Sequence, residues 1–369
     1  MFMFAVAMII LYYIHLNYLL FLFDIMKWKK YAKTKGSLPK ISVIIAARDD
    51  ETVIENTLKR LKASYPRKKL DIVVVDYSRD NTAKIARKYA RVFTAKKPGR
   101  ASALNLGVQK SRNDIIYFLD SDSLVEKDTI KMLVSGGEAV AGISLPINKG
   151  SFSERIGRLG AASFNALEIS IEGLLKTVLF PGKNVMVRKD ILNKVGGFSE
   201  SLTEDLNFSM KLYMAGQKIK LLPAYCHELV PYKISHYWRQ QEKWRLGTAD
   251  EIKHYIRYLS LLELVVFLPY LVIRAMIAPV SVIFMVLFFL FPNYILLSGM
   301  LLGIIIMFVA CVRFLDKDDL LLFPFLFLIY GVIDLMLLLN TLFKFNRERK
   351  WYRTPKQGYG PSKPHLEQT

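Results

Sequence analysis

A run of 22 residues without a formal charge, Phe2–Phe23, lies close to the N-terminus and is too apolar for a segment exposed to water. A helix needs about 20 apolar residues to cross a bilayer. Six lysines follow between Lys27 and Lys40. A signal peptide carries its positive charge before the apolar run, so this order predicts an uncleaved membrane anchor instead. The positive-inside rule then places the residues from Lys27 onward in the cytoplasm.

A second apolar region extends from Leu261 to Phe343. Prolines within its first third argue against one straight span. The sequence does not fix the number of spans, which can be even or odd. Because six Lys or Arg residues lie in Lys344–Lys356, the tail is expected in the cytoplasm, which favours an even number. Asp334 lies inside the last apolar stretch, where a carboxyl group is either functional or packed against a partner.

Composition excludes several classes of protein. Apolar residues make up 52% of the 369-residue chain, which is far too many for a disordered protein. Two cysteines, Cys226 and Cys311, stand far apart, so a disulfide scaffold is excluded. The formal net charge of +20 comes with no motif that reads DNA and no basic-aromatic signature for single strands. Since basic clusters flank the apolar regions, anionic membrane lipids are the expected partners and nucleic acid is not.

The residues between the two apolar regions predict an α/β domain with a mostly parallel sheet. Short apolar runs at Ile41–Ala46, Leu70–Val75, Arg91–Thr94 and Ile115–Leu119 alternate with helical patterns. Such alternation is typical of parallel strands joined by helical crossovers. In these sheets ligands bind beyond the carboxyl ends of the strands, so the polar residues that follow each strand are the candidate site.

Acidic residues follow three of these strands. Asp49 and Glu51 come after the first, Asp76 after the second, and Asp120 and Asp122 after the fourth. Several carboxylates at one edge repel each other unless a cation or a ligand group neutralises them. Their oxygens suit Mg²⁺ or Mn²⁺, which also bind diphosphate oxygens. The sequence therefore predicts a divalent cation at this edge.

With these residues the chain resembles the membrane-bound, inverting glycosyltransferases of family 2, which have the GT-A fold and include polysaccharide synthases and enzymes of the ceramide-glucosyltransferase kind. The resemblance covers roughly residues 41–255 and, more weakly, the basic tail segment KWYRTPK (Lys350–Lys356), and it rests on motifs in family order. These are IIAARDDE (Ile44–Glu51), VDYSRDNT (Val75–Thr82), GRASALNLG (Gly99–Gly107), DSD (Asp120–Asp122), VGGF (Val195–Phe198), TED (Thr203–Asp205) and RQQEKW (Arg239–Trp244). Three departures are an Asp-rich motif one residue short, Arg100 in place of Lys, and Lys243 in place of Arg.

The resemblance implies a nucleotide-diphosphate sugar as donor. It implies that the donor is held by Ala46, Asp49, Glu51, Asp76, Ser78, Arg100 and Asp120. Asp122, helped by Asp120, would bind the cation, which neutralises the charge that the leaving diphosphate gains. Asp205 is expected as the base that takes the acceptor proton, with Glu204 second. A structural reading stands beside this one, in which Thr203 caps a helix and the two acids lie in its first turn.

The acceptor side is expected on an amphipathic helix. The resemblance implies that Arg239, Gln240, Lys243 and Trp244 contact the diphosphate or the acceptor, although Trp244 also suits a membrane interface. The loop FPGKN (Phe180–Asn184) is either an acceptor contact or a plain turn. The acceptor itself would be a lipid or a glycan.

The expected segments are an N-terminal anchor, a basic linker, a catalytic domain, an interface helix, a membrane region and a basic tail, at residues 1–26, 27–39, 40–232, 233–260, 261–343 and 344–369. We expect an integral membrane glycosyltransferase with a cytoplasmic catalytic domain. A processive synthase is the main alternative. A nucleotidyltransferase is disfavoured because a glycine-rich loop is missing after the first strand, and a non-enzymatic scaffold is disfavoured because no key acid is lost. Homo-oligomer formation stays open.

Overall fold

The computed structural model describes residues 37–258 except 96 and 98, scattered positions between 261 and 309, and residues 311–344, 354–356 and 358. The predicted N-terminal anchor therefore lies outside the described residues, as does most of 261–310. The chain divides into two compact units. The sheet unit lies within residues 30–148, 175–230 and 355–369, and the helical unit lies within residues 1–29, 149–174 and 231–354.

The sheet unit is built on eight strands in the order β3-β2-β1-β4-β7-β6-β8-β5. The strands are β1 (Ile41–Ala47), β2 (Leu70–Asp76), β3 (Arg91–Thr94), β4 (Ile115–Phe118), β5 (Leu124–Val125), β6 (Ala139–Pro146), β7 (Val185–Arg188) and β8 (Lys220–Glu228). β3, β2, β1 and β4 pair in parallel, whereas β7 pairs antiparallel with both β4 and β6. β6 and β8 are parallel, and β5 is antiparallel to β8. The sheet is thus parallel in its first half and mixed in its second, which is the α/β arrangement of a GT-A fold.

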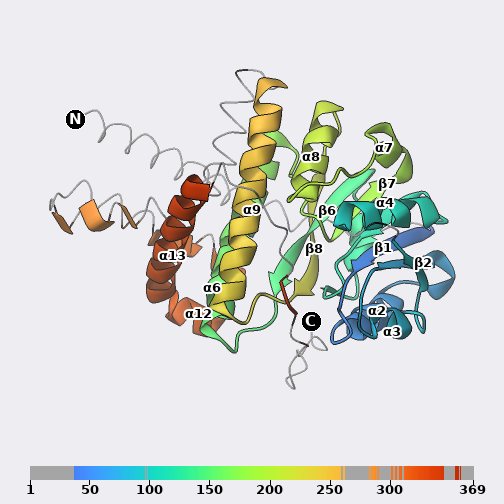
Figure 1. The fold of residues 1–369 in the computed structure, drawn as a ribbon, viewed down its shortest axis with the longest axis horizontal. Coiled ribbons are helices and arrows are strands. Elements are labelled where there is room, and N and C mark those ends of the chain that lie inside the picture. The colour runs from blue at the N-terminus through green and yellow to red at the C-terminus, as the bar shows by residue number, and fades with distance from the viewer. Residues whose placement is uncertain are drawn as a thin grey trace. The chain divides into compact units, whose positions relative to one another are not determined.

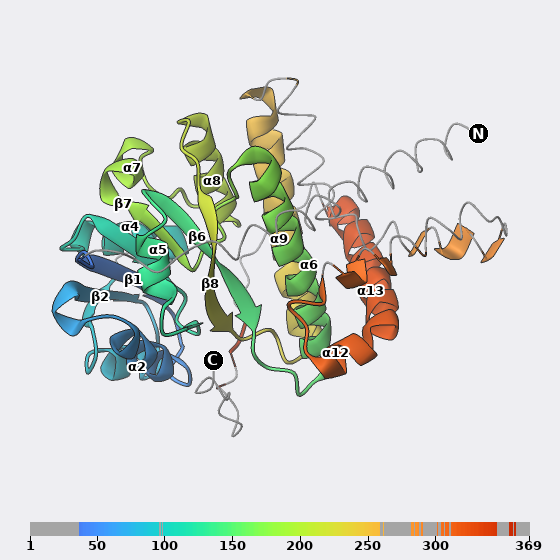
Figure 2. The ribbon, with the colours of Figure 1, turned by 180° about the vertical axis from the view of Figure 1, so that it is seen from behind.

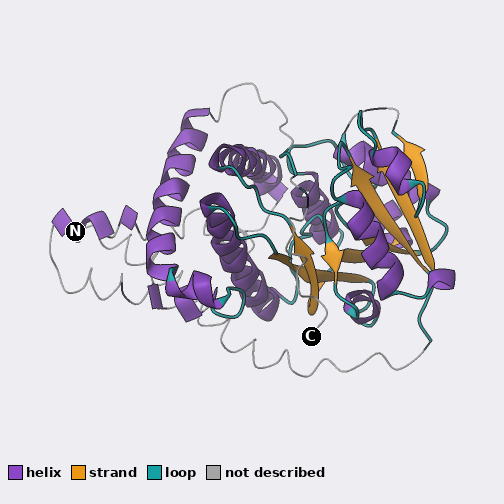
Figure 3. Ribbon diagram, turned by 90° about the horizontal axis from the view of Figure 1, so that it is seen from below, coloured by secondary structure: helices purple, strands orange, loops and turns teal. Residues whose placement is uncertain are grey.

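Helices cover both faces of this sheet, as Figure 3 shows for the strands drawn in orange. They are α2 (Ile54–Ser64), α3 (Thr82–Ala86), α4 (Arg100–Lys110), α5 (Thr129–Val134), α7 (Lys189–Lys194) and α8 (Glu204–Met214). Figure 1 shows α4 beside β1 and β2, and α2 on the opposite face. α4 approaches β1 closely because Gly107 has no side chain, since a Cβ there would lie 2.3 Å from Cγ2 of Ile44.

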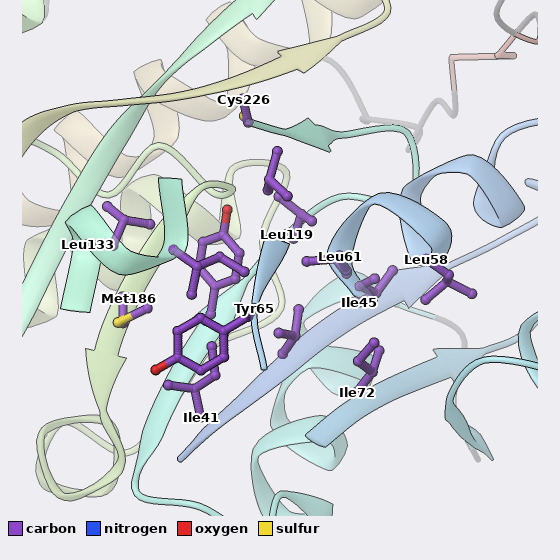
Figure 4. Packing of buried hydrophobic residues seen from close by; sticks show 14 of the residues in the cluster. Ile41, Ile45, Leu58, Leu61, Tyr65, Ile72, Leu119, Leu133, Met186 and Cys226 are labelled. Carbon is purple, nitrogen blue, oxygen red and sulfur yellow. The ribbon is translucent and has the colours of Figure 1, made fainter. Parts of the chain in front are cut away.

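The core explains why the central strands read as continuous apolar runs. Six of the seven residues of β1 are buried, because helices pack on both faces. Figure 4 shows Ile41 and Ile45 of β1 among Leu58 and Leu61 of α2 and Ile72 of β2. This packing fixes the carboxyl ends of β1, β2 and β4 at one edge of the sheet, where the acidic residues follow.

The helical unit contains α6 (Phe152–Leu175), α9 (Ile234–Tyr255), η3 (Ile256–Tyr258), α12 (Lys317–Leu321) and α13 (Phe323–Lys344). Figure 2 shows α9 beside α6. Buried charges tie these helices together. Asp319, 1% exposed, accepts hydrogen bonds from Arg155 at 2.7 Å and from Arg158 at 2.5 Å, which joins α6 to α12.

Asp334 is also buried, and it pairs with Arg245 of α9. Of the two readings of this carboxyl group, the structure supports the packed and partnered one. Glu242 of α9 likewise accepts hydrogen bonds from Asn340 and Lys344 of α13, the latter at 2.6 Å. Polar contacts from the middle of α9 therefore hold it to α13.

Within the described residues, α13 is the one helix long and apolar enough to cross a membrane, with a mean hydropathy of 2.1 over its most apolar window. A third of that window is buried inside the protein. A core helix of a soluble protein can have the same length and composition.

Candidate active site

The loop after β1 and the loop after β2 are joined by one serine. The backbone N–H of Asp49 donates to Oγ of Ser78 at 2.7 Å, and that hydroxyl donates to Oδ1 of Asp76 at 2.6 Å. A second bond joins the same two loops, because Oδ1 of Asp49 accepts from the backbone N–H of Arg79 at 2.8 Å. The shortened Asp-rich motif therefore still brings Ser78 to two of the acids expected to hold the donor.

Glu51 lies at the exposed rim of the same two loops. Its Oε2 accepts from the backbone N–H of Asn81 at 3.1 Å and from the Asn81 side chain at 3.0 Å. Ala46 lies on β1 beside Val75 of β2, close to the start of these loops. Five of the residues expected to hold the donor (Ala46, Asp49, Glu51, Asp76 and Ser78) thus gather at the ends of β1 and β2.

Arg100, the first residue of α4, connects the two other acidic segments. Its Nη2 donates to Oδ1 of Asp120 at 2.6 Å and to the carbonyl oxygen of Gly182 at 2.8 Å. Its Nη1 donates to Oε1 of Glu204 at 2.6 Å. A planar guanidinium can hold two carboxylates at once because its donors form a rigid fork. Arg100 therefore fixes the end of β4 against the start of α8.

This contact changes the chemistry of Asp120. Burial by itself would raise the pKa of that carboxyl group, but the positive charge of Arg100 outweighs burial and lowers the pKa to about 2. Asp120 is therefore ionised throughout the physiological range. Asp122 behaves differently, because burial raises its pKa and the neighbouring Lys356 only partly opposes this effect.

Asp205 lies beside the FPGKN loop. Gly182 has a φ of +76°, and a Cβ at this position would lie 2.8 Å from Oδ2 of Asp205 and 3.4 Å from Nη1 of Arg100. The loop thus passes against the expected base, and Gly182 is required both by its backbone conformation and by the lack of space. The loop therefore lies beside Asp205 and Arg100, and its contact with an acceptor stays a prediction.

Thr203 stands at the N-cap position of α8, but its side chain makes no capping hydrogen bond. Its hydroxyl is buried and has no hydrogen-bond partner among the described residues. The capping role expected for Thr203 is therefore wrong. Glu204 and Asp205 still lie in the first turn of α8, where the helix dipole stabilises negative charge.

Four phenylalanines anchor the segments that carry these residues. Phe118 ends β4 two residues before Asp120, and Phe208 lies on α8 after Asp205. Their rings pack with Phe180 and Phe198, with centroids 5.7 Å apart for Phe118 and Phe180 and 4.3 Å apart for Phe198 and Phe208. The cluster makes a rigid apolar support beneath the polar site.

The motifs VGGF and GRASALNLG contact each other beside the phenylalanine cluster. Asn105 of α4 donates from Nδ2 to the carbonyl oxygen of Phe198 at 2.8 Å and accepts from its N–H at 2.9 Å. A Cβ on Gly197, whose φ is +66°, would lie 2.6 Å from Oδ1 of Asn105. These contacts therefore tie the VGGF segment to α4.

A lysine that the sequence did not single out lies at the acidic edge. Nζ of Lys356 is 3.1 Å from Oδ1 of Asp122 and donates to Oγ of Ser121 at 2.9 Å. Only the three-dimensional structure identifies it, since the tail was recognised merely as a basic segment.

No group of three or more His, Cys, Asp or Glu side chains in the described part of the chain is arranged to hold a metal ion by itself. Mg²⁺ is usually bound by one or two carboxylates, together with waters and substrate phosphates. Asp120 and Asp122 supply two carboxylates directly after β4, and the lowered pKa of Asp120 keeps one of them ionised. The residues therefore fit a divalent cation that is completed by the donor.

Arg239, Gln240, Lys243 and Trp244 lie on α9 in the helical unit. Arg239 is exposed, Gln240 and Lys243 are half-buried, and the ring of Trp244 is 38% exposed. The four residues lie within two neighbouring turns of α9.

Comparison with known proteins agrees with this arrangement. The family model described as Glycosyl transferase family group 2 matches residues 115–333, more than half of the chain. The chain is 31% identical over 259 residues to the probable glycosyltransferase YdaM of Bacillus subtilis, covering 63% of this chain and 60% of that protein. It is 29% identical over 227 residues to the poly-beta-1,6-N-acetyl-D-glucosamine synthase of Staphylococcus aureus, covering 57% and 55%. The chain thus spans less than two thirds of the length of these curated relatives.

Among solved structures, the chain is similar to the mannosyltransferase PcManGT from Pyrobaculum calidifontis, determined in complex with GDP-Man and Mn²⁺. The TM-score is 0.56 at 19% sequence identity, covering 94% of this chain and 99% of that one. This likeness shows a common GT-A fold. Together with the family match, it leads to one conclusion about identity: the chain belongs to glycosyl transferase family group 2.

Proposed function

We propose that this chain transfers a sugar from a nucleotide-diphosphate sugar to a lipid-linked or polysaccharide acceptor, by a metal-assisted single displacement that inverts the anomeric centre. The observation that carries the proposal is the contact of Arg100 with both Asp120 and Glu204. It brings the acids expected at the donor and the acids expected at the acceptor hydroxyl to one place, as a direct transfer between two substrates needs.

The donor would bind at the ends of β1 and β2. The hydrogen-bonded set of Asp49, Ser78 and Asp76 is supported from two strands, and Ala46 and Glu51 lie next to it. Such a set offers carboxylate oxygens to the hydroxyls of a ribose and to the N–H groups of a base. The mannosyltransferase of the same fold was determined with GDP-Man, a guanosine donor.

Asp122, with Asp120 beside it, would hold a divalent cation, Mg²⁺ or Mn²⁺. When bound, such an ion neutralises the charge that develops on the leaving diphosphate. The role of Asp122 is to place one carboxylate at that point, and the role of Asp120 is to stay ionised there. The lowered pKa of Asp120 supports the second role.

Asp205 would take the proton from the acceptor hydroxyl. Glu204 is already engaged by Arg100 at 2.6 Å, which leaves fewer lone pairs for a proton. Asp205 lies against Gly182, where a Cβ would come within 2.8 Å of its Oδ2. These contacts favour Asp205 over Glu204 as the base.

Gln240, Lys243, Trp244 and Arg239 would serve the acceptor and the diphosphate from α9. Trp244 is 38% exposed, and an accessible indole offers a surface on which a sugar can stack. Lys243 would meet phosphate as a point charge rather than as a planar fork. We further propose that residues 1–26 and the region 261–343 insert in the membrane, with α13 as one span and the sheet unit in the cytoplasm.

A processive polysaccharide synthase is the second candidate. It is favoured by the 29% identity to a poly-N-acetylglucosamine synthase. A nucleotidyltransferase or a non-enzymatic scaffold is less consistent with the retained acids Asp120, Asp122 and Asp205.

The test is a panel of nucleotide sugars offered to the purified protein in detergent, with Mn²⁺ or Mg²⁺ and with short glycans or lipid extracts as acceptors. We expect turnover of one donor that is abolished by a chelator, and a product linked through the opposite anomeric configuration. The length of the product chains separates single transfer from processive synthesis. Failure to turn over any nucleotide sugar, or turnover in the presence of chelator, would contradict the proposal.

A further inference from the structure

The C-terminal tail returns to the acidic edge of the sheet unit. Lys356 approaches Asp122 at 3.1 Å and Asp50 at 3.7 Å, although more than 200 residues separate it from both. The same tail makes a second approach, because a Cβ on Gly358 would lie 3.3 Å from the carbonyl oxygen of Thr52. The tail therefore lies beside the loop after β1 at two positions, Lys356 and Gly358.

The group that Lys356 meets is a connected one. Its Nζ donates to Oγ of Ser121 at 2.9 Å, and that hydroxyl donates to Oδ2 of Asp50 at 2.7 Å. The side chains of Asp50 and Asp122 are only 4% and 8% exposed. Two buried carboxylates this close to each other need a compensating positive charge. Burial alone would lower the pKa of Lys356, but the charges of Asp122, Asp50 and Asp120 reverse the effect and raise it.

The position of Lys356 conflicts with that of a metal ion on Asp122. A divalent cation lies about 2.0–2.6 Å from its carboxylate oxygens, depending on the ion. The ammonium group already lies 3.1 Å from one of the two oxygens of Asp122. Two cations at one carboxylate in a poorly solvated place repel each other strongly. One of them must therefore withdraw unless further negative charge arrives.

We propose that Lys356 is a positioning residue of the donor site, whose ammonium group holds Asp122 and Asp50 in place before donor binding and gives way at Asp122 to the divalent cation. This inference rests on the proposed function, because it takes Asp122 as the metal ligand. The diphosphate of an incoming donor supplies the negative charge that allows the exchange. The cation alone then binds weakly, and cation and donor bind together.

The experiment measures binding of Mn²⁺ alone to the full chain in detergent, by electron paramagnetic resonance of the free ion and without nucleotide. Lys356→Gln removes the competing charge, so Mn²⁺ should bind at least ~5-fold more tightly than to the wild type. Lys356→Arg keeps the charge and should stay within ~2-fold of the wild type. Lys131→Gln is the matched control, because Lys131 pairs with the exposed Asp128 of the same unit and should leave the affinity unchanged.

Two further variants separate failure of this inference from failure of the proposed function. Asp122→Asn should abolish Mn²⁺ binding both alone and combined with Lys356→Gln. If Asp122→Asn binds Mn²⁺ normally, the metal site itself is wrong, and the inference falls with it. If Asp122→Asn abolishes binding but Lys356→Gln binds Mn²⁺ no more tightly than the wild type, the inference alone is overturned. Thermal unfolding of each variant confirms that the compared proteins are folded.

Discussion

Arg100 donates to Glu204 at 2.6 Å, although the two residues stand 104 positions apart in the sequence. The pair joins the first turn of α4 to the first turn of α8, and Glu204 is only 5% exposed. Because the other arm of the guanidinium holds Asp120, one side chain sets the distance between the donor and acceptor parts of the proposed site.

Replacing Arg100 should therefore damage stability and turnover together. Arg100→Gln leaves Asp120 and the buried Glu204 without their partner, which should lower the free energy of unfolding by about 1–3 kcal/mol because the contacts are only part-buried. Arg100→Lys keeps the charge but can no longer hold both acids through a rigid fork, so it should be intermediate. Denaturant unfolding and donor turnover measured on the same preparations test this. A fully active and stable Arg100→Gln protein would show that the contact has no such role.

The two acids of α8 should respond differently to loss of their charge. Asp205→Asn should lower kcat at least ~100-fold without loss of stability, because it removes the proposed base. Glu204→Gln should mainly lower stability, because it removes a partner of Arg100. Steady-state kinetics and thermal unfolding distinguish the two. Normal turnover in Asp205→Asn with a large loss in Glu204→Gln would move the base to Glu204.

Gly182 and Gly216 offer a matched pair of glycine substitutions. Their φ angles are +76° and +70°, so alanine introduces the same kind of backbone strain at both, of order 1–3 kcal/mol. At Gly182 the new Cβ would meet Asp205 at 2.8 Å, whereas at Gly216 no described atom lies within 4 Å. Both variants should lose stability, but only Gly182→Ala should also lose turnover at a temperature where both are folded. Equal turnover in the two would remove the FPGKN loop from the site.

The lowered pKa of Asp120 predicts a pH dependence of stability. The folded pKa, about 2, lies below the ordinary value of 3.8, so the contact with Arg100 contributes stability above that ordinary value. The contribution is lost as the pH falls from near 4 towards 2. In metal-free buffer, the difference in unfolding free energy between wild type and Asp120→Asn should therefore be constant near pH 7 and shrink below pH 4. A difference that does not change with pH would mean that Arg100 does not act through this charge.

Much of the sheet unit could be predicted from sequence because parallel strands covered on both faces leave a clear apolar signal. The runs at Ile41–Ala46, Leu70–Val75 and Ile115–Leu119 correspond to β1, β2 and β4. The rule that ligands bind beyond the carboxyl ends of parallel strands then predicted that the acids after β1, β2 and β4 lie together, and the structure places them at one edge of the sheet. The later strands gave weaker signals, since β5 has two residues and β7 has four.

What the sequence could not give is the pairing of distant charges. Nothing in the pattern around Asp334 selects Arg245, and nothing in the tail points Lys356 towards Asp122. Motif resemblance also did not show which motif residues contact one another within the protein. Asn105 and Phe198 belong to two family motifs, and only the structure shows that they bind each other.

The most direct test of the account is donor turnover by Asp122→Asn at saturating Mn²⁺, compared with Asp190→Asn, which removes an exposed carboxylate that pairs with Arg188. The account predicts that Asp122→Asn loses at least ~100-fold in turnover with folding intact, because the leaving diphosphate is no longer neutralised. Asp190→Asn should turn over donor like the wild type. Turnover by Asp122→Asn at the wild-type rate would contradict the metal-assisted mechanism at this edge of the sheet.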